Sequence, residues 1–335
     1  MQYEEILHGL APQDLPVYRS DRYDGSGFSV EVADFESQDI ERIHWVYLRV
    51  DELYQTWRER GMVADPETLK GPLEELISPH FIREAQRLGE FSLEVGQSSA
   101  RISKALHDLK SGALNGLVGY SQLLPLLSTE ERKGTLQKIV FLARDYAKIA
   151  RNLIRDIDPE ARMADEQEQE HGIDHFLQHW QGFEFRRQGV EARVQVESTF
   201  EGSVTNRCLE TSTVDRILYN LLNNAGRFAV SSPIRLNVLP VGDQLIRWVV
   251  SNTVDQDQKD WLNQEIGDDL SILFLGGHTR DGHGLGLRNC TDIVVEGFGL
   301  GSPREAVARK YLGAQVVGDR FFAWFHWPVV VTSAH

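Results

Sequence analysis

Apolar residues recur every three or four positions between residues 102 and 157, the spacing that lines one side of a helix. Between two such series, Ser128 and Glu131 have the spacing of a capping box, in which two side chains bind the free amides at a helix start. The pattern predicts two long antiparallel helices joined by a short turn. The apolar positions are Ile102, Leu106, Leu109, Ala113, Leu117, Tyr120 and Leu124 in the first helix, and Leu136, Ile139, Ala143, Tyr146, Ala150, Leu153 and Ile157 in the second.

A hairpin of two helices buries only a narrow stripe of each. A second copy of the hairpin would complete a four-helix bundle and cover what one copy leaves exposed. We therefore predict an all-α hairpin that forms a four-helix bundle in a homodimer.

The C-terminal half of the chain has strand patterns as well as helical ones. Apolar residues alternate over 190–196, over 234–238 and 246–250 on either side of the turn-like Gly242-Asp243, and over 321–327. A helical pattern covers 212–228. Strands mixed with helices predict an α+β sandwich, with helices packed over a sheet.

The clearest boundary is the stretch from Asp156 to Glu170, where acids, glutamines and a proline leave almost nothing apolar to bury. We expect an N-terminal region at 1–90, the hairpin domain at 91–158, a linker at 159–172 and the sandwich domain at 173–335. In the N-terminal region, apolar spacing from Ile40 to Trp57 predicts one helix that stops near Gly61. A sensor, a dimer extension and a partner-docking element all remain open for this region.

Composition and charge exclude several classes of partner and location. The chain has 335 residues and a formal net charge of −15, so it repels nucleic acid phosphates, and no basic stripe offsets this charge. Two cysteines, Cys208 and Cys290, cannot build a disulfide framework. The first residues lack the pattern of a signal peptide, and no apolar segment is long enough to span a membrane. These features predict a cytoplasmic protein without a membrane span and without a nucleic acid partner.

The first candidate site is His107, one residue after the apolar position Leu106, which turns its side chain roughly 100° from the buried stripe. Most exposed histidines have no role. Asp108, however, can fix the imidazole in one tautomer and leave the other ring nitrogen free as a nucleophile.

The second candidate lies on the 212–228 helix, where Asn220, Asn224 and Arg227 share one face. A polar outer face is the ordinary interpretation, but asparagine is a poor helix former. An amide oxygen can bind magnesium, and a guanidinium can bind a phosphate.

The third candidate is the alternation of Gly282, Gly284 and Gly286 just before a helical pattern, where backbone amides could cradle phosphates. A second glycine run, from Gly297 to Gly301, follows it.

Taken in order, these three motifs resemble those of sensor histidine kinases of two-component systems. The residues around His107 resemble the phospho-acceptor box, the helix with Asn220 and Asn224 resembles the asparagine box of the GHKL (Bergerat-type) nucleotide-binding fold, and the first glycine run resembles its ATP lid and second glycine box. We favour the first glycine run over the second because Phe274 and Thr279 belong to the stretch that resembles the lid. The resemblance covers residues 91–328. It implies that Asn224 holds the magnesium that bridges the ATP phosphates, and that Ser111 occupies the place of a polar residue that acts in dephosphorylating the partner.

The chain departs from this family after residue 250, where the first glycine box is absent. That box normally carries an aspartate that binds the adenine amino group. Asn252 stands in its place, and its carbonyl oxygen can accept the same hydrogen bond with less charge.

The resemblance implies an ATP-dependent protein histidine kinase, with ATP and Mg²⁺ as cofactors, that autophosphorylates on His107. The phosphoryl group would then pass to an aspartate on a response-regulator receiver domain. The alternative is a degenerate phosphotransfer or scaffold protein that keeps the bundle but has a decayed nucleotide pocket. A third class is a GHKL ATPase whose bundle serves only to dimerise.

Overall fold

The chain folds into two compact units. The computed structural model describes residues 3–16, 29–62, 67–94, 100–187, 190–278 and 285–330. Gly25–Gln167 form one unit, here called the helical unit. Met1–Asp24 and Glu168–His335 together form the other, the sheet unit. In sequence, the helical unit is therefore an insertion within the sheet unit, and each unit is described by itself below.

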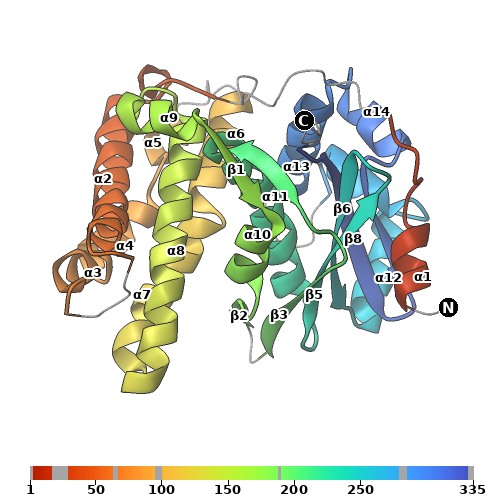
Figure 1. Cartoon of the computed structure of the whole chain (residues 1–335), viewed down its shortest axis with the longest axis horizontal. Coiled ribbons are helices and arrows are strands. Elements are labelled where there is room, and N and C mark those ends of the chain that lie inside the picture. The colour runs from red at the N-terminus through yellow and green to blue at the C-terminus, as the bar shows by residue number, and fades with distance from the viewer. Residues whose placement is uncertain are drawn as a thin grey trace. The chain divides into compact units, whose positions relative to one another are not determined.

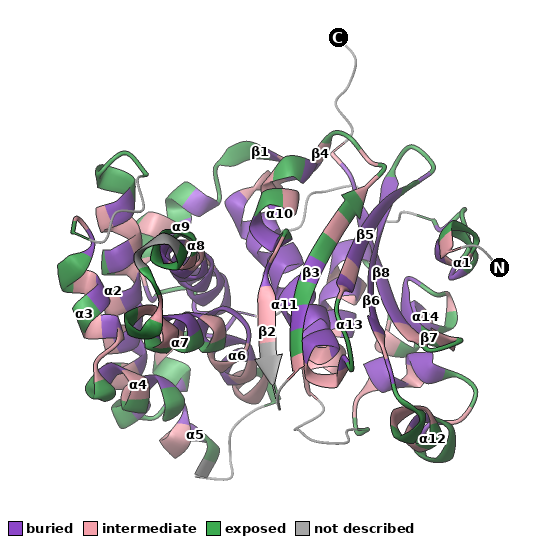
Figure 2. Cartoon of the chain, turned by 90° about the horizontal axis from the view of Figure 1, so that it is seen from below, coloured by how far each residue is buried: buried purple, intermediate pink, exposed green. Residues whose placement is uncertain are grey.

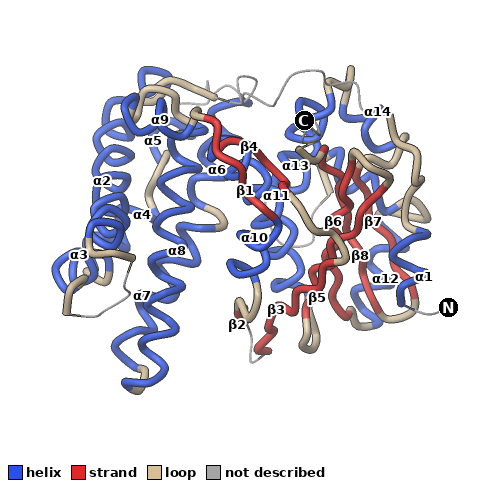
Figure 3. The backbone as a smooth tube through the Cα atoms, viewed as in Figure 1, coloured by secondary structure: helices blue, strands red, loops and turns tan. Residues whose placement is uncertain are grey.

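The sheet unit contains a six-stranded mixed sheet in the order β2-β3-β5-β6-β8-β7, drawn in red in Figure 3. Strands β3 and β5 are parallel and the other neighbours are antiparallel. A separate pair, β1 and β4, is antiparallel. The strands are β1 (Glu168–Gly172), β2 (Glu184–Arg187), β3 (Val190–Ser198), β4 (Ser203–Arg207), β5 (Ile234–Val241), β6 (Leu245–Thr253), β7 (Leu312–Val317) and β8 (Arg320–Pro328).

Helices lie on both faces of this sheet (Figure 1). On one face α10 contacts β3, α11 contacts β6 and α13 contacts β8. On the other face lies α1, from the start of the chain. The central strands β5, β6 and β8 are consequently buried (Figure 2). The helices of this unit are α1 (Tyr3–Gly9), α10 (Ile173–Trp180), α11 (Cys208–Phe228), α12 (Gln256–Glu265), the short 3-10 helix η3 (Leu270–Leu275), α13 (Leu285–Phe298) and α14 (Pro303–Ala308).

The local predictions for this half are confirmed. The predicted strands are β3, β5, β6 and β8, and the turn between β5 and β6 contains Gly242 with a φ of 61°. The predicted helix is α11, which begins at Cys208, before the predicted start at residue 212.

The helical unit is built around α8 (Thr129–Leu153), which packs against α7 (Ala113–Leu123), α6 (Ala100–Lys110) and α2 (Ser37–Glu59). The capping box predicted from Ser128 and Glu131 is present at the start of α8. The other elements are η1 (Val32–Asp34), α3 (Lys70–Leu76), α4 (Pro79–Gln86), α5 (Glu90–Glu94), η2 (Leu124–Leu126) and α9 (Pro159–Asp165).

Helix α2 covers the hairpin from within the same chain. Leu142, Tyr146 and Ile149 on α8 are at most 3% exposed in a single copy. We predicted a second copy because a lone hairpin would leave an apolar stripe exposed. Helix α2 already packs against α8, so less of this stripe is left for a second copy to cover.

Two regions differ from the expected domain boundaries. Residues 159–172, expected as a linker, contain α9 and β1. Helix α9 forms because the Asp158 side chain accepts a hydrogen bond from the Ala161 amide and because an ion pair of 2.6 Å joins Arg151 to Asp165. The N-terminal region 1–90 is divided between the units, because residues 3–16 pack on the sheet.

One buried cation ties residues 3–16 to the sheet. Arg247 on β6 has no exposed surface and donates to the carbonyl oxygens of Leu7, Ala11 and Pro12 at 2.8–2.9 Å. Its Nε lies 2.9 Å from Nε2 of His326. The other ring nitrogen, Nδ1, lies 2.9 Å from the Tyr311 carbonyl oxygen, so Nδ1 carries the proton and Nε2 accepts from Arg247.

We predict that His326 makes the sheet unit sensitive to acid. Burial and the nearby Arg247 charge lower the pKa of His326 to about 3. The unfolded chain takes up this proton near pH 6.5. Between these two pH values unfolding therefore binds a proton, and stability falls as pH falls, by up to about 1.4 kcal/mol per pH unit.

The measurement is urea unfolding at pH 7 and pH 4, followed by pulsed hydrogen exchange in β6 and β8 peptides. His326→Gln keeps an acceptor for Arg247 and cannot titrate, so it should lose about 2–3 kcal/mol less stability than the wild type over this range. Equal losses in both proteins would contradict the prediction.

Candidate functional site

His107 lies near the end of α6 with its side chain 21% exposed. Its Nδ1 lies 3.1 Å from Oδ1 of Asp108, whose side chain is 3% exposed. A carboxylate in this position accepts a hydrogen bond from Nδ1–H, which keeps the proton on Nδ1 and leaves Nε2 with its lone pair. The contact expected from the sequence is present, and the imidazole is partly rather than fully exposed.

Ser111 lies beside the same ring nitrogen, with its Oγ 3.5 Å from Nδ1 of His107. Its amide donates to the His107 carbonyl oxygen at 2.8 Å and closes the last turn of α6. The three residues singled out in the sequence are therefore one cluster.

The first helix of the hairpin is broken immediately after this cluster. The apolar spacing predicts one helix from residue 102 to 124, whereas the structure has two helices there, α6 and α7. Gly112 has φ 71° and ψ −116°, a backbone conformation that cannot continue a helix and that strongly favours glycine. The break fixes where α6 ends relative to His107.

The nucleotide site candidates lie on the sheet unit. Helix α11 is buried continuously from Cys208 to Leu222, and becomes half-buried from residue 223 onward at positions 223, 224, 227 and 228. Asn220 is thus buried, with its Nδ2 donating to the Arg216 carbonyl oxygen at 2.9 Å. Asn224 and Arg227 are half-buried. The partly exposed polar face predicted for Asn220, Asn224 and Arg227 is therefore present only in the last turns of α11, which carry Asn224 and Arg227.

Asn224 and Arg227 both have capacity to bind a ligand. Among the described residues, Asn224 has no hydrogen-bond partner. The Nε of Arg227 is buried without a partner in the same part of the chain, while its guanidinium lies 5.7 Å from the Phe228 ring centre.

Asn252 lies near the end of β6 and is 2% exposed. Its Nδ2 donates to the Thr253 carbonyl oxygen at 3.1 Å, and this same oxygen accepts from the Val230 amide at 3.3 Å. Val230 follows the end of α11, so the structure brings Asn252 close to the end of the helix that carries Asn224. The Oδ1 of Asn252 accepts no hydrogen bond within the described ranges, which leaves it available for a donor on a ligand.

The glycine candidates are only partly described. Gly286 lies in the first turn of α13, whose free amides suit an anion, and α13 packs against α11. Gly282 and Gly284 lie outside the described residues. The alternative run from Gly297 to Gly301 lies at the opposite, C-terminal end of α13, where carbonyl groups rather than amides are free.

Arg288 also contributes to this region, although the sequence motifs did not predict it. It donates to the Leu275 carbonyl oxygen at 2.9 Å and pairs with Asp292 at 3.1 Å, so it ties the start of α13 to the end of η3. In the sequence, only the spacing of four residues between Arg288 and Asp292 indicated this ion pair, and such pairs are common on helices.

The residues fit a magnesium ion held mainly by phosphate oxygens. No group of three or more His, Cys, Asp or Glu side chains that could hold a metal occurs among the described residues. Asn224 can offer one amide oxygen, and magnesium bound with a nucleotide takes most of its other ligands from phosphates and water.

Comparison with known proteins gives structural resemblance only. No protein-family model matches the chain, and no curated protein matches its sequence. The mycobacterial sensor histidine kinase MprB is similar at 15% identity, over 41% of this chain and 82% of that chain, with a TM-score of 0.30. Full-length ShkA in complex with AMPPNP is similar at 17% identity, over 66% of this chain and 44% of ShkA, with a TM-score of 0.32.

The histidine kinase AdeS of Acinetobacter baumannii is similar at 10% identity, over 67% of this chain and 98% of that chain, with a TM-score of 0.26. In its described residues, the chain has no helix with the length and apolar character needed to cross a membrane.

We predict that Gly112→Ala destabilises the helical unit by about 1–3 kcal/mol, because alanine is strained at this φ and ψ. Gly119→Ala is the matched control within α7. Gly119 is exposed, and an added Cβ there meets nothing within 4 Å. Alanine should stabilise that position by roughly 0.5–1 kcal/mol. Urea unfolding monitored by hydrogen exchange in α6 and α8 checks both, and a neutral Gly112→Ala would contradict the account of the break.

Proposed function

From the residues of the two candidate sites, we propose that this chain is an ATP-dependent protein histidine kinase that autophosphorylates on His107. Its sequence motifs, which resemble those of sensor histidine kinases, support this proposal. The observation that carries this proposal is the 3.1 Å contact between Nδ1 of His107 and Asp108.

In the proposed reaction, Nε2 of His107 attacks the terminal phosphorus of ATP. A bond from nitrogen to phosphorus forms, the bond from phosphorus to the bridging oxygen breaks, and ADP leaves. Asp108 stabilises the positive charge that develops on the ring by holding the Nδ1 proton. Asn224 would hold a magnesium ion, which neutralises charge on the phosphates when bound.

In the second step, a carboxylate oxygen of a response-regulator aspartate attacks the same phosphorus and His107 is released. Ser111 lies where it can contact a group near Nδ1 of His107, which supports a role in the later removal of phosphate from the regulator. A cytoplasmic location belongs to this proposal, since the reaction consumes ATP.

Dimerisation remains a prediction. Because α2 packs against α8 within one chain, the part of α8 that it covers is not open to a second copy. Analytical ultracentrifugation at micromolar concentration tests this, and a monomer would contradict it.

The test of the kinase is incubation with γ-labelled ATP and magnesium, followed by acid and alkali treatment. We expect label that is labile in acid and stable in alkali, and its complete loss in His107→Gln. His44→Gln is a matched control, because His44 lies in the same unit and has no partner among the described residues. Label that persists in His107→Gln would overturn the assignment, and an absence of ATP binding would favour the phosphotransfer scaffold.

We further predict that Asp108→Asn slows labelling by about 100-fold. This is the size of rate loss expected when a side chain that positions a proton in the reaction is removed. The asparagine amide can donate to Nδ1, which shifts the proton to Nε2 and removes the nucleophilic lone pair. Initial rates of labelling at saturating ATP measure this. Unchanged ATP affinity is the control, because Asp108 lies on a different unit from the nucleotide site.

A further inference from the structure

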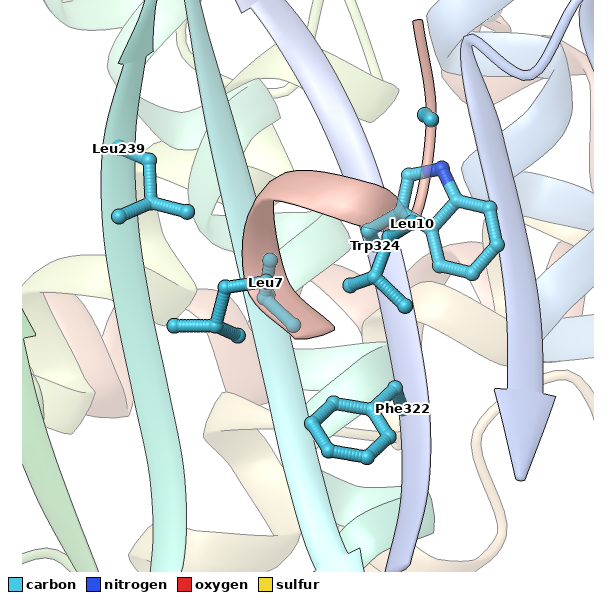
Figure 4. Packing of buried hydrophobic residues seen from close by; sticks show 7 residues of the cluster. Leu7, Leu10, Leu239, Phe322 and Trp324 are labelled. Carbon is cyan, nitrogen blue, oxygen red and sulfur yellow. The ribbon is translucent and has the colours of Figure 1, made fainter. Parts of the chain in front are cut away.

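Residues 3–16, here called the N-terminal segment, cover the face of the sheet opposite α11. Figure 4 shows Leu7 and Leu10 over Leu239, Phe322 and Trp324, which come from β5 and β8. All five side chains are at most 7% exposed. The segment is therefore packed as part of the core of the sheet unit.

The segment also has a polar anchor near the end of β6. The Tyr3 hydroxyl donates to Oδ1 of Asn237 at 2.8 Å and lies 2.9 Å from Oγ of Ser251. The Arg235 and Arg320 guanidiniums lie over the Tyr3 ring, at 4.8 and 5.9 Å from its centre. Tyr3 thus joins the ends of β5, β6 and β8 on this face.

Side chains alternate along β6, so neighbouring residues face opposite sides of the sheet. Arg247, Val249 and Ser251 face the N-terminal segment. Trp248 lies on the other face, where it contacts Phe176 of α10 at 5.3 Å, and Asn252 follows the same alternation. The residue that Tyr3 holds is therefore the direct neighbour of the residue whose Oδ1 is available for a ligand.

Tyr3 holds the end of β6 from one face, where its hydroxyl lies 2.9 Å from Oγ of Ser251. On the other face, the Asn252 side-chain amide donates to the carbonyl oxygen of Thr253, the next residue of the same strand. A small rotation of Ser251 about the strand would turn the Asn252 side chain as well, because the two residues share a peptide plane.

We infer that Tyr3 is a positioning residue for nucleotide recognition, which acts through Ser251 to orient the Oδ1 of Asn252 toward the exocyclic amine of adenine. The inference rests on the proposed function. It makes the start of the chain part of the nucleotide site, although Tyr3 itself lies on the opposite face of the sheet.

The test is a double-mutant cycle of Tyr3→Phe and Asn252→Ala in the full chain, with binding of two nucleotides measured by calorimetry in magnesium. One nucleotide is ATP, and the other is purine riboside triphosphate, which lacks the amine. Tyr3→Phe keeps the ring and removes the hydroxyl, so we expect ATP binding to weaken about three- to tenfold, and purine riboside triphosphate binding to change by less than about twofold.

In the Asn252→Ala background, Tyr3→Phe should have no further effect on ATP, because the group that it positions is absent. Tyr311→Phe is the matched control. Its hydroxyl donates to the Pro16 carbonyl oxygen, so it removes a contact to the same segment without touching β6, and it should leave the preference for ATP unchanged. Additive losses, or equal losses for both nucleotides, would overturn the inference.

A second measurement needs no nucleotide. Tyr3→Phe should increase amide hydrogen exchange at Asn252 and Thr253. Unchanged exchange at these residues, together with normal ATP binding, would overturn the inference and leave the proposed function intact. If the wild type binds neither nucleotide, the proposed function fails and the inference fails with it. Increased exchange in that case would identify the contact as structural only.

Discussion

The sheet unit depends on one strand, β6, that is buried on both faces. Eight of its nine residues are buried, and they alternate between the helical layer and the N-terminal segment. A strand with only one covered face shows alternating polar and apolar residues, whereas the side chains of β6 pack into a buried layer on each face of the sheet. That requirement explains why Trp248 and Arg247 can be neighbours, since one packs against Phe176 and the other binds carbonyl oxygens.

The buried charge of Arg247 decides how the N-terminal segment is held. Burying a cation is costly unless its donors are all directed to acceptors. Here five donor contacts reach four backbone carbonyl oxygens and the neutral His326 ring. Burial lowers the pKa of Arg247 to about 10, so the group keeps its charge near neutral pH. A segment that supplies four carbonyl oxygens cannot leave without exposing this charge to water or leaving it unpaired.

The sequence predicted what depends on neighbours in the chain. The capping box at Ser128, the β5–β6 hairpin and the Asp108 contact to His107 are all local, and all are present. It did not predict the contacts between distant residues. Nothing in the pattern around Arg247 shows that its partners are residues 7–12, and the helical spacing across Gly112 continues even though its backbone does not. The sequence placed Asn220 on an open face of the helix, whereas it is buried. Periodicity predicts the direction in which a side chain points from a helix, but not which other elements cover that side.

The two candidate sites lie on different units, and the chain passes between these units twice. One passage lies between residues 24 and 25, and the other between residues 167 and 168. In the proposed kinase reaction the imidazole of His107 attacks a phosphate held near Asn224, on the same chain or on a second copy. The N-terminal segment, which precedes the first passage, is held on the sheet by Arg247 and Tyr3. The contacts that complete the core of the sheet unit therefore also fix the chain ahead of its entry into the helical unit.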